Sequence, residues 1–323
     1  MKFSQKLKSS VVTGLLISSA VVALSTSVAK AETVRVAMLA PSALLWLHAI
    51  AEEEGFYDKR DIQIEELRAQ NSPALLQAVS SRSVEAGISL GDLVIRAIDQ
   101  GAPIAITGAV LDKTILRFVG APGIETPADL AGKKVTAGAV KGGTANLLLH
   151  QLQGHGVAPD QVQMIAIPNS RDRIVALGNG QVDGALLIAP FDAVAQEQGM
   201  KVLEDYAEPY LQTPLIVNKD WAAENPEAAE GLTQAMQEAA VWIYDPENKD
   251  AAISILANYT KAEPEIAAAS YAFIVEQQQA IGKNFEVPAA SLQNIVDINA
   301  SLEGTEPVTL DISKYYDPSM LAK

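Results

Sequence analysis

Hydrophobic positions in the first third of the chain alternate between strand and helix periods. Val34, Val36 and Met38 alternate with polar residues before the chain turns apolar, which predicts a strand. The helical period follows directly, and Gly55 stands where a helix C-cap is expected. Strand and helix then keep alternating with short connections, which is typical of a parallel sheet covered by helices on both faces. The strands of this first round are predicted at residues 33–39, 62–67, 84–90 and 104–110, with helices at 44–54 and from 73 and 91.

A second round of the same alternation occupies residues 115–203 and is followed by a different pattern. From residue 219 to 282 the chain shows consecutive helical periods, with Pro226, Pro246 and Pro264 in first turns. The pattern therefore predicts an α/β protein with two parallel-rich sheets flanked by helices and a helical C-terminal tail. The second-round strands are predicted at 115–119, 135–139, 162–167, 182–188 and 201–203.

The N-terminus has the pattern of an export signal. Lys2, Lys6 and Lys8 precede an apolar stretch at 11–24, and Ala29-Lys30-Ala31 matches a small-x-small cleavage site. We therefore expect residues 1–31 to be a cleaved signal peptide. The chain contains no cysteine, so no lipid-modified cysteine can follow the signal. The expected location is the periplasm, without a lipid anchor.

Composition and charge exclude several classes of function. A formal net charge of −15 argues against nucleic acid as a partner, because affinity for phosphate backbones rests on cationic contacts. The lack of cysteine excludes disulfides, thiolate metal sites and cysteine nucleophiles. His48, His150 and His155 show no metal-ligand spacing. No cofactor is expected, because the glycines match neither a P-loop nor a dinucleotide fingerprint.

Residues 133–152 read as a strand, a glycine turn and a helix that opens at Thr144. Gly142 and Gly143 leave the first helical N–H groups pointing outward, where a polar or anionic head group can bind. The alternative is an ordinary strand–helix connection in which Thr144 caps the helix.

Gly87, Ser89 and Gly91 form a G-x-S-x-G sequence at a predicted strand-to-helix turn, where a hydrolase nucleophile would sit. A serine hydrolase of that kind needs an acid and then a histidine later in the chain. The last histidine is His155, so hydrolysis by Ser89 is a disfavoured alternative.

Several segments together resemble a known family. The two most specific are TPADLAGKKV at 126–135 and LGNGQVDGA at 177–185. The chain resembles, over roughly residues 33–310, the periplasmic substrate-binding proteins of ABC importers. The group concerned binds nitrate, sulfonates and taurine, and also includes binders of thiamine-precursor pyrimidines.

This resemblance implies a type II-like fold of two lobes with a ligand cleft between them. Lobe one is expected to comprise residues 32–111 and 213–323, and lobe two residues 112–212. The hinge is expected near 110–114 and 212–213. Ligand contacts are expected where strands end and helices begin. The candidate ligand-binding residues are Ser42, Trp46, Asn71, Ser89 and Asp92 in lobe one, and Gly143, Thr144, Asn169, Arg171 and Pro190 in lobe two.

The resulting hypothesis is binding without chemistry by a monomer that delivers its ligand to an ABC permease and its ATPase. Arg171 and Lys141 suit an anion such as a sulfonate or carboxylate, and Asp92 suits an amino or ring N–H group. An apolar wall is expected from Leu45, Trp46 and Phe191. A pyrimidine ligand, an enzyme of the same fold and a receptor that feeds a sensor remain alternatives.

Overall fold

The computed structural model describes residue 1, residues 31–140 and residues 142–322. The predicted signal peptide lies almost wholly outside the described residues. Within the described part of the chain, no helix combines the length and the apolar character needed to cross a bilayer.

Lobe one is built on a five-stranded sheet with the order β2-β1-β3-β10-β4. β1 pairs in parallel with β2 and β3, whereas β10 runs antiparallel to both β3 and β4. The strands are β1 (Glu32–Met38), β2 (Ile62–Arg68), β3 (Ala86–Ile88), β4 (Ile104–Lys113) and β10 (Pro209–Asn218).

Lobe two is built on a second five-stranded sheet with the order β7-β6-β8-β5-β9. β6 pairs in parallel with β7 and β8, and β5 runs antiparallel to β8 and β9. The strands are β5 (Leu116–Gly120), β6 (Lys134–Thr136), β7 (Gln163–Met164), β8 (Gly184–Ile188) and β9 (Lys201–Tyr206).

The fold class is confirmed, and both sheets are parallel-rich but mixed, because each contains one strand, β10 or β5, that runs antiparallel to the other four. These two strands lie where the chain passes between the lobes. β5 and β10 each follow a strand of the other sheet after only a few residues, so no crossover helix forces them to run parallel. The expected lobe boundaries at 111/112 and 212/213 fall inside β4 and β10 and remain predictions.

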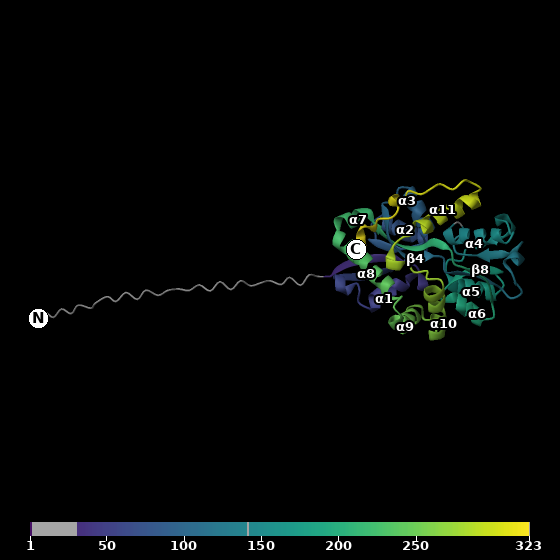
Figure 1. The fold of residues 1–323 in the computed structure, drawn as a ribbon, viewed down its shortest axis with the longest axis horizontal. Coiled ribbons are helices and arrows are strands. Elements are labelled where there is room, and N and C mark those ends of the chain that lie inside the picture. The colour runs from purple at the N-terminus through teal and green to yellow at the C-terminus, as the bar shows by residue number, and fades with distance from the viewer. Residues whose placement is uncertain (2–30, 141, 323) are drawn as a thin grey trace. The chain divides into compact units, whose positions relative to one another are not determined.

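Helices cover both sheets, and their order follows the predicted alternation (Figure 1). In lobe two, the two faces of β5 pack against different helices. Phe118 belongs to the apolar cluster that contains Leu147 and Leu148 of α4, and Val119 belongs to a separate cluster with Ile174 of α5. The helices of the two strand–helix rounds are α1 (Trp46–Glu53), α2 (Ser72–Ser80), α3 (Gly91–Asp99), α4 (Gly143–Gly154), α5 (Ser170–Gly178) and α6 (Phe191–Glu197).

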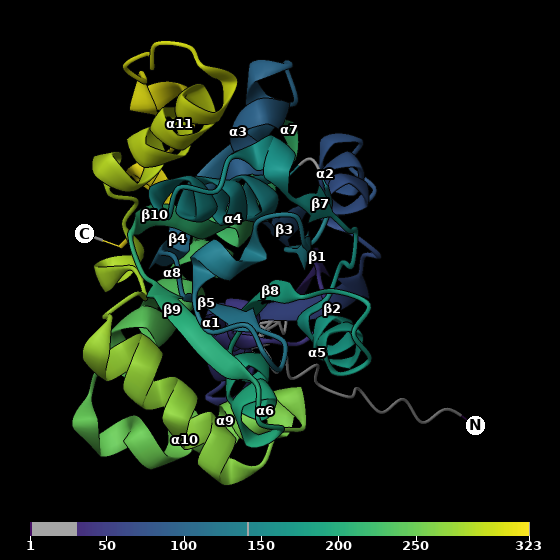
Figure 2. The same cartoon turned by 90° about the vertical axis from the view of Figure 1, so that its right-hand side faces the viewer.

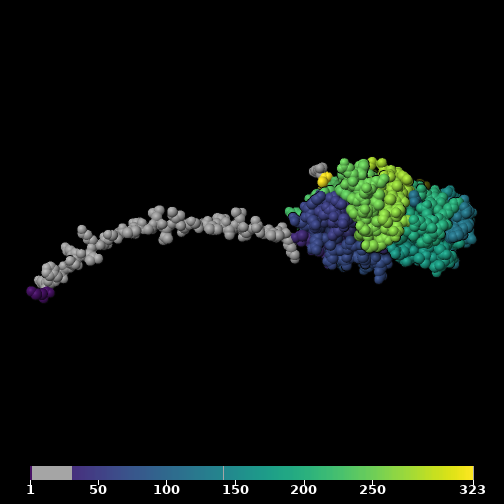
Figure 3. All heavy atoms as spheres, turned by 90° about the horizontal axis from the view of Figure 1, so that it is seen from below, coloured from purple at the N-terminus to yellow at the C-terminus, as the bar shows by residue number. Residues whose placement is uncertain are grey.

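The helical tail that follows β10 packs onto lobe one. Figure 3 shows these green and yellow segments in contact with the blue N-terminal part of the chain. In the interior, the Thr233 hydroxyl of α8 donates to the Thr107 hydroxyl of β4 at 3.1 Å. The tail helices are α7 (Lys219–Glu224), α8 (Pro226–Trp242), α9 (Lys249–Thr260), α10 (Pro264–Tyr271) and α11 (Ala289–Glu303).

Two helix starts differ by one residue from the sequence prediction. α2, expected from residue 73, begins at Ser72 and is capped by Asn71, whose side-chain oxygen accepts a hydrogen bond from the N–H of Ala74 at 3.0 Å. The helix expected to open at Thr144 begins at Gly143, with Gly142 as the N-cap residue. Both starts lie at the cleft described below.

Candidate ligand cavity

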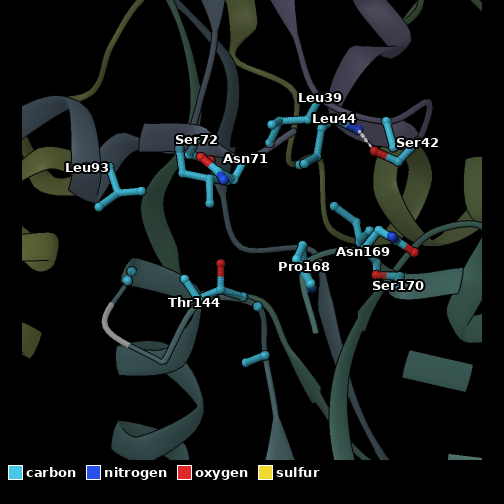
Figure 4. A pocket seen from close by; sticks show the side chains of 18 of the residues that line it. Leu39, Ser42, Leu44, Asn71, Ser72, Leu93, Thr144, Pro168, Asn169 and Ser170 are labelled. Carbon is cyan, nitrogen blue, oxygen red and sulfur yellow. Dashed lines mark hydrogen bonds between the residues drawn. The ribbon is translucent and has the colours of Figure 1, made fainter. Parts of the chain in front are cut away.

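A cavity of about 370 Å³ lies between the two lobes. Its lining comes from segments that follow strands β1 and β2 in lobe one, and from segments that follow β6, β7 and β8 in lobe two. Figure 4 shows Leu39, Leu44 and Asn71 on one side of this space and Thr144, Pro168 and Asn169 on the other. The carboxyl ends of strands in both lobes therefore converge on one space, as the cleft prediction required.

Helices α2, α4 and α5 begin at the cavity. α2 and α5 are capped by side chains, since the Asn71 oxygen accepts from Ala74 and the Asn169 oxygen accepts from the Asp172 N–H at 2.9 Å. α4 has no such cap, because its N-cap residue is Gly142. Among the described residues, the first N–H groups of α4 therefore have no side-chain acceptor. The hydroxyl of Thr144 points into the same space (Figure 4).

Arg173 of α5 brings a buried positive charge to the cavity wall. It is 6% exposed, and it donates three hydrogen bonds of 2.8 Å to the carbonyl oxygens of Ile167, Leu186 and Pro168. These bonds hold the guanidinium in place but leave its charge unneutralised. Burial lowers the pKa of Arg173 to about 10, so the group stays protonated at neutral pH.

The described lining contains no Asp or Glu, so no carboxylate at the cavity compensates Arg173. Gly138 makes room for the guanidinium. A Cβ atom there would lie 3.2 Å from Nη2 of Arg173, and the φ angle of +118° favours glycine as well. Sequence and backbone are thus adapted to a cationic group at this wall.

The remaining wall is mainly apolar. Leu44 and Phe191 face the cavity from opposite lobes. The guanidinium carbon of Arg171 lies 5.6 Å from the ring centroid of Phe191. The principal apolar side chains are Leu39, Leu44, Leu90, Leu93, Leu116, Ile188 and Phe191. The cavity thus offers a polar region near α4 and Arg173 and an apolar body elsewhere.

Half of the candidate residues from the sequence line this cavity, and they come from both lobes. They are Ser42, Asn71, Gly143, Thr144 and Asn169. Of the expected apolar wall, Phe191 lines the cavity and Leu45 does not. Lys141 lies outside the described residues.

Trp46 does not line the cavity and belongs to the core. It is 1% exposed, its Nε1 donates to the Ala252 carbonyl at 3.0 Å, and its ring meets Tyr271 edge-on at 6.0 Å. The cavity is lined by Leu44 instead. Leu44 lies in the 3-10 turn Ala43–Leu45, which faces the cavity, whereas Trp46 begins α1 and points into the core.

Ser89 and Asp92 are also absent from the lining, although Leu90 and Leu93 belong to it. Ser89 and Asp92 are each 1% exposed, and the Ser89 hydroxyl is buried without a partner among the described residues. Asp92 accepts hydrogen bonds from Arg96 and Asn299. The turn after β3 therefore presents leucines to the cavity and turns its polar side chains into the protein.

Arg171 and Pro190 likewise do not contribute to the lining. Pro190 precedes α6 and lies between Ile188 and Phe191 in the sequence, and those two residues do line the cavity. Arg171 is exposed, whereas Arg173 is buried. The helical period could have distinguished the two arginines, because Arg173 shares the inward face with Ile174 and Leu177, whereas Arg171 does not.

The described part of the chain contains no group of three His, Asp or Glu side chains arranged to hold a metal ion. The polar groups that the lining offers to a ligand are helix N–H groups, hydroxyls, amides and one guanidinium.

Comparison with known sequences gives a family match. The family model described as NMT1/THI5 like matches residues 48–249, which is more than half of the chain. A protein of Brucella abortus (strain 2308), provisionally named a binding protein, is 27% identical over 223 residues, covering 67% of each chain.

Comparison with solved structures shows the same fold in proteins of low sequence identity. The ligand-binding component of an ABC-type import system from Staphylococcus aureus has a TM-score of 0.74 at 13% identity, over 90% of this chain and 97% of that one. The alkanesulfonate-binding protein SsuA from Xanthomonas axonopodis pv. citri, bound to MOPS, gives 0.72 at 16% identity, over 89% and 99%. The periplasmic nitrate-binding protein NrtA from Synechocystis PCC 6803 gives 0.73 at 17% identity, over 90% and 87%.

Proposed function

The chain belongs to the NMT1/THI5-like family, and we propose that it is the periplasmic solute-binding component of an ABC importer. Its ligand is a small organic anion, a sulfonate or a carboxylate with an apolar body. The anion binds at Arg173 and the N-terminus of α4, and the apolar part lies against the leucines and Phe191.

The observation that carries this proposal is the buried guanidinium of Arg173. A charge taken out of water is costly unless a partner of opposite sign accompanies it. The described lining provides no carboxylate, so a bound anion is the natural partner. Helix dipoles add to the attraction, since α4 and α5 both direct their N-termini at the cavity.

The size and polarity of the cavity favour an organic anion over nitrate. A space of about 370 Å³ falls within the range of sites that take drug-sized ligands. Nitrate would leave most of the leucine-rich wall uncovered. The structurally similar sulfonate-binding protein, solved with MOPS bound, supports a sulfonate as one member of the class.

A pyrimidine remains the alternative ligand because of the family. An aminopyrimidine is best held by a carboxylate that accepts from its amino group. Asp92 was the expected acceptor, but its side chain faces away from the cavity wall. The anion is therefore the better-supported ligand.

The proposed mechanism is closure of the two lobes around the ligand, without a chemical step. The ligand contacts both lobes, so it stabilises the closed arrangement in proportion to the contacts made only there. The closed form then docks on a membrane permease. Catalysis by Ser89 is not supported, because Ser89 lies outside the cavity and no histidine follows His155.

A thermal-shift screen with charge-matched pairs tests the proposal. Benzoate is compared with benzamide and benzenesulfonate with benzenesulfonamide, alongside nitrate and an aminopyrimidine. A ligand at about 100 times its Kd stabilises by about 2.7 kcal/mol, which corresponds to a rise of several degrees in Tm. We expect the organic anions to raise Tm and their neutral partners to leave it unchanged. Equal shifts from the neutral amides, or turnover of an ester without any binding, would contradict the proposal.

A further inference from the structure

A short chain of amide side chains joins the lobes beside the cavity. Nδ2 of Asn146 on α4 donates to Oδ1 of Asn299 on α11 at 2.7 Å. Nδ2 of Asn299 in turn donates to Oδ1 of Asp92 on α3, also at 2.7 Å. We call these three residues the interlobe clasp. Figure 2 shows α11 and α3 next to α4, which belongs to the other lobe.

The lobe-one end of the clasp is buried. Asp92 is 1% exposed, and its Oδ1 also accepts from Nε of Arg96 at 3.2 Å. The first turn of α4 packs directly on this residue. A Cβ atom at Gly143 would lie 2.5 Å from Cβ of Asp92 and 2.9 Å from the hydroxyl of Tyr210. Only glycine at this position lets α4 approach α3 so closely.

The clasp holds part of the cavity wall without being part of it. Gly142, Gly143 and Thr144 line the cavity, and Asn146 lies in the next turn of the same helix. Asn299 and Asp92 do not line the cavity. Because α4 carries uncapped N–H groups, its position relative to lobe one decides whether a ligand held by lobe one can reach them.

We propose that Asn299 is a positioning residue, which draws the N-terminus of α4 onto lobe one and thereby increases ligand affinity without touching ligand. This inference rests on the proposed binding function. In a receptor with two lobes, the apparent affinity is the intrinsic affinity multiplied by the fraction of closed molecules. A net hydrogen bond changes an equilibrium constant by about 3- to 10-fold. Loss of the interlobe bond therefore lowers the equilibrium constant for closure by about 3- to 10-fold and lowers affinity by up to the same factor.

Labelling at two exposed positions measures closure directly. The chain has no native cysteine, so Val175→Cys on α5 and Val241→Cys on α8 give one label in each lobe. Interlobe distance distributions are recorded with and without benzenesulfonate, and its Kd is measured by calorimetry.

Asn299→Leu removes both clasp bonds, and Asn146→Ala removes only the bond between the lobes. The matched control is Gln293→Leu on the same helix, whose side chain bonds to Asp297, Val308 and Leu310 within the C-terminal segment. We expect both clasp variants to shift the distances towards the open form and to raise Kd by about 3- to 10-fold, with the control unchanged. The variant that combines Asn146→Ala and Asn299→Leu should bind ligand as tightly as Asn299→Leu alone, because Asn299→Leu already removes both bonds.

Unchanged distances and affinity in Asn146→Ala, which is the variant with little risk to folding, would overturn the inference. So would an equal effect of Gln293→Leu. If benzenesulfonate and the other organic anions fail to bind even the unaltered protein, the proposed function fails. The ligand-free distances of the clasp variants then still decide whether the clasp holds the lobes together.

Discussion

The hydroxyl of Thr114 donates to the carbonyl of Tyr206 at 2.7 Å and ties together the two segments that pass between the lobes. The same oxygen accepts from the N–H of Glu208 at 2.8 Å, and the N–H of Thr114 donates to the Glu208 carbonyl at 2.9 Å. Thr114 is fully buried. Thr114 belongs to the predicted hinge segment 110–114, whereas Tyr206 and Glu208 precede the predicted segment 212–213. These bonds hold the two crossings side by side.

Replacing Thr114 by valine should destabilise the protein. Valine keeps the shape but leaves the Tyr206 carbonyl and the Glu208 N–H without their partner, at a cost of about 1–3 kcal/mol. Urea unfolding measures the change, and Thr114→Ser is the control because it keeps the hydroxyl. Equal stability of the valine and serine variants would show that the bonds contribute nothing.

Arg173 and Arg171 provide a paired test of the anion site. Arg173→Met should raise the Kd for benzenesulfonate by about 10- to 100-fold, because hydrogen bonds to charged groups contribute about 1.5–3 kcal/mol. Arg171→Met should change it less than about twofold, since surface charges contribute little. Calorimetric titration measures both.

The same substitution at Arg173 also frees three carbonyl groups, so it will lower stability. Binding is therefore measured at a temperature where circular dichroism shows the variant folded. Arg173→Lys keeps the charge but not the three-way bonding and should bind with intermediate affinity. A larger loss of affinity in Arg171→Met than in Arg173→Met would show that Arg171, and not Arg173, binds the anion.

Alanine substitutions at two glycines of α4 distinguish the effect of close packing from the effect of helix propensity. Gly143→Ala places a Cβ atom 2.5 Å from Cβ of Asp92, which must push α4 away from lobe one. The cost of such overpacking is about 1–3 kcal/mol, so we expect Kd for benzenesulfonate to rise about tenfold or more. Gly154→Ala meets no atom within 4 Å and should leave affinity unchanged. Wild-type affinity in Gly143→Ala would mean that α4 binds without closing on α3.

Asp112, close to the hinge, predicts a pH dependence of stability. Burial raises the pKa of its carboxyl to about 6, against the opposing charges of Lys113 and Lys283. One oxygen is buried and has no partner among the described residues. Because the folded state binds the proton more tightly than the unfolded state, the ionised carboxylate destabilises the fold. This cost is absent below about pH 4, grows between about pH 4 and 6, and is complete above.

Asp112→Asn removes the titration, so its stability relative to wild type should increase between about pH 4.5 and pH 7.5. The increase is about 1–2 kcal/mol, because the side chain is only partly buried and solvent screens its charge. Urea unfolding of both proteins at several pH values measures the difference. A difference that stays constant with pH would show that Asp112 does not titrate in this range.

Much of the fold could be predicted from local pattern. The alternation of strand and helix, the helix over 170–178 and the tail after residue 218 all correspond to elements of the structure. Hydrophobic period and turn residues set these features, and neither depends on distant parts of the chain. The mixed sheets were not predictable in this way, because strand direction depends on how the chain crosses between lobes.

The candidate site was likewise predictable only in part. The strand–helix pattern of the sequence placed the candidate loops at the carboxyl ends of strands, and the family resemblance implied that the loops of the two lobes face one cleft. Ser42, Asn71, Gly143, Thr144 and Asn169 follow from these two inferences. Only the tertiary structure decided which side chain in each loop faces inward, since one helical step of about 100° turns a side chain from cavity to core. A shift of two residues exchanged Trp46 for Leu44 and Arg171 for Arg173. The tertiary structure also turned Asp92 from the expected ligand contact towards Asn299, because α11 is brought beside α3 from more than two hundred residues further along the chain.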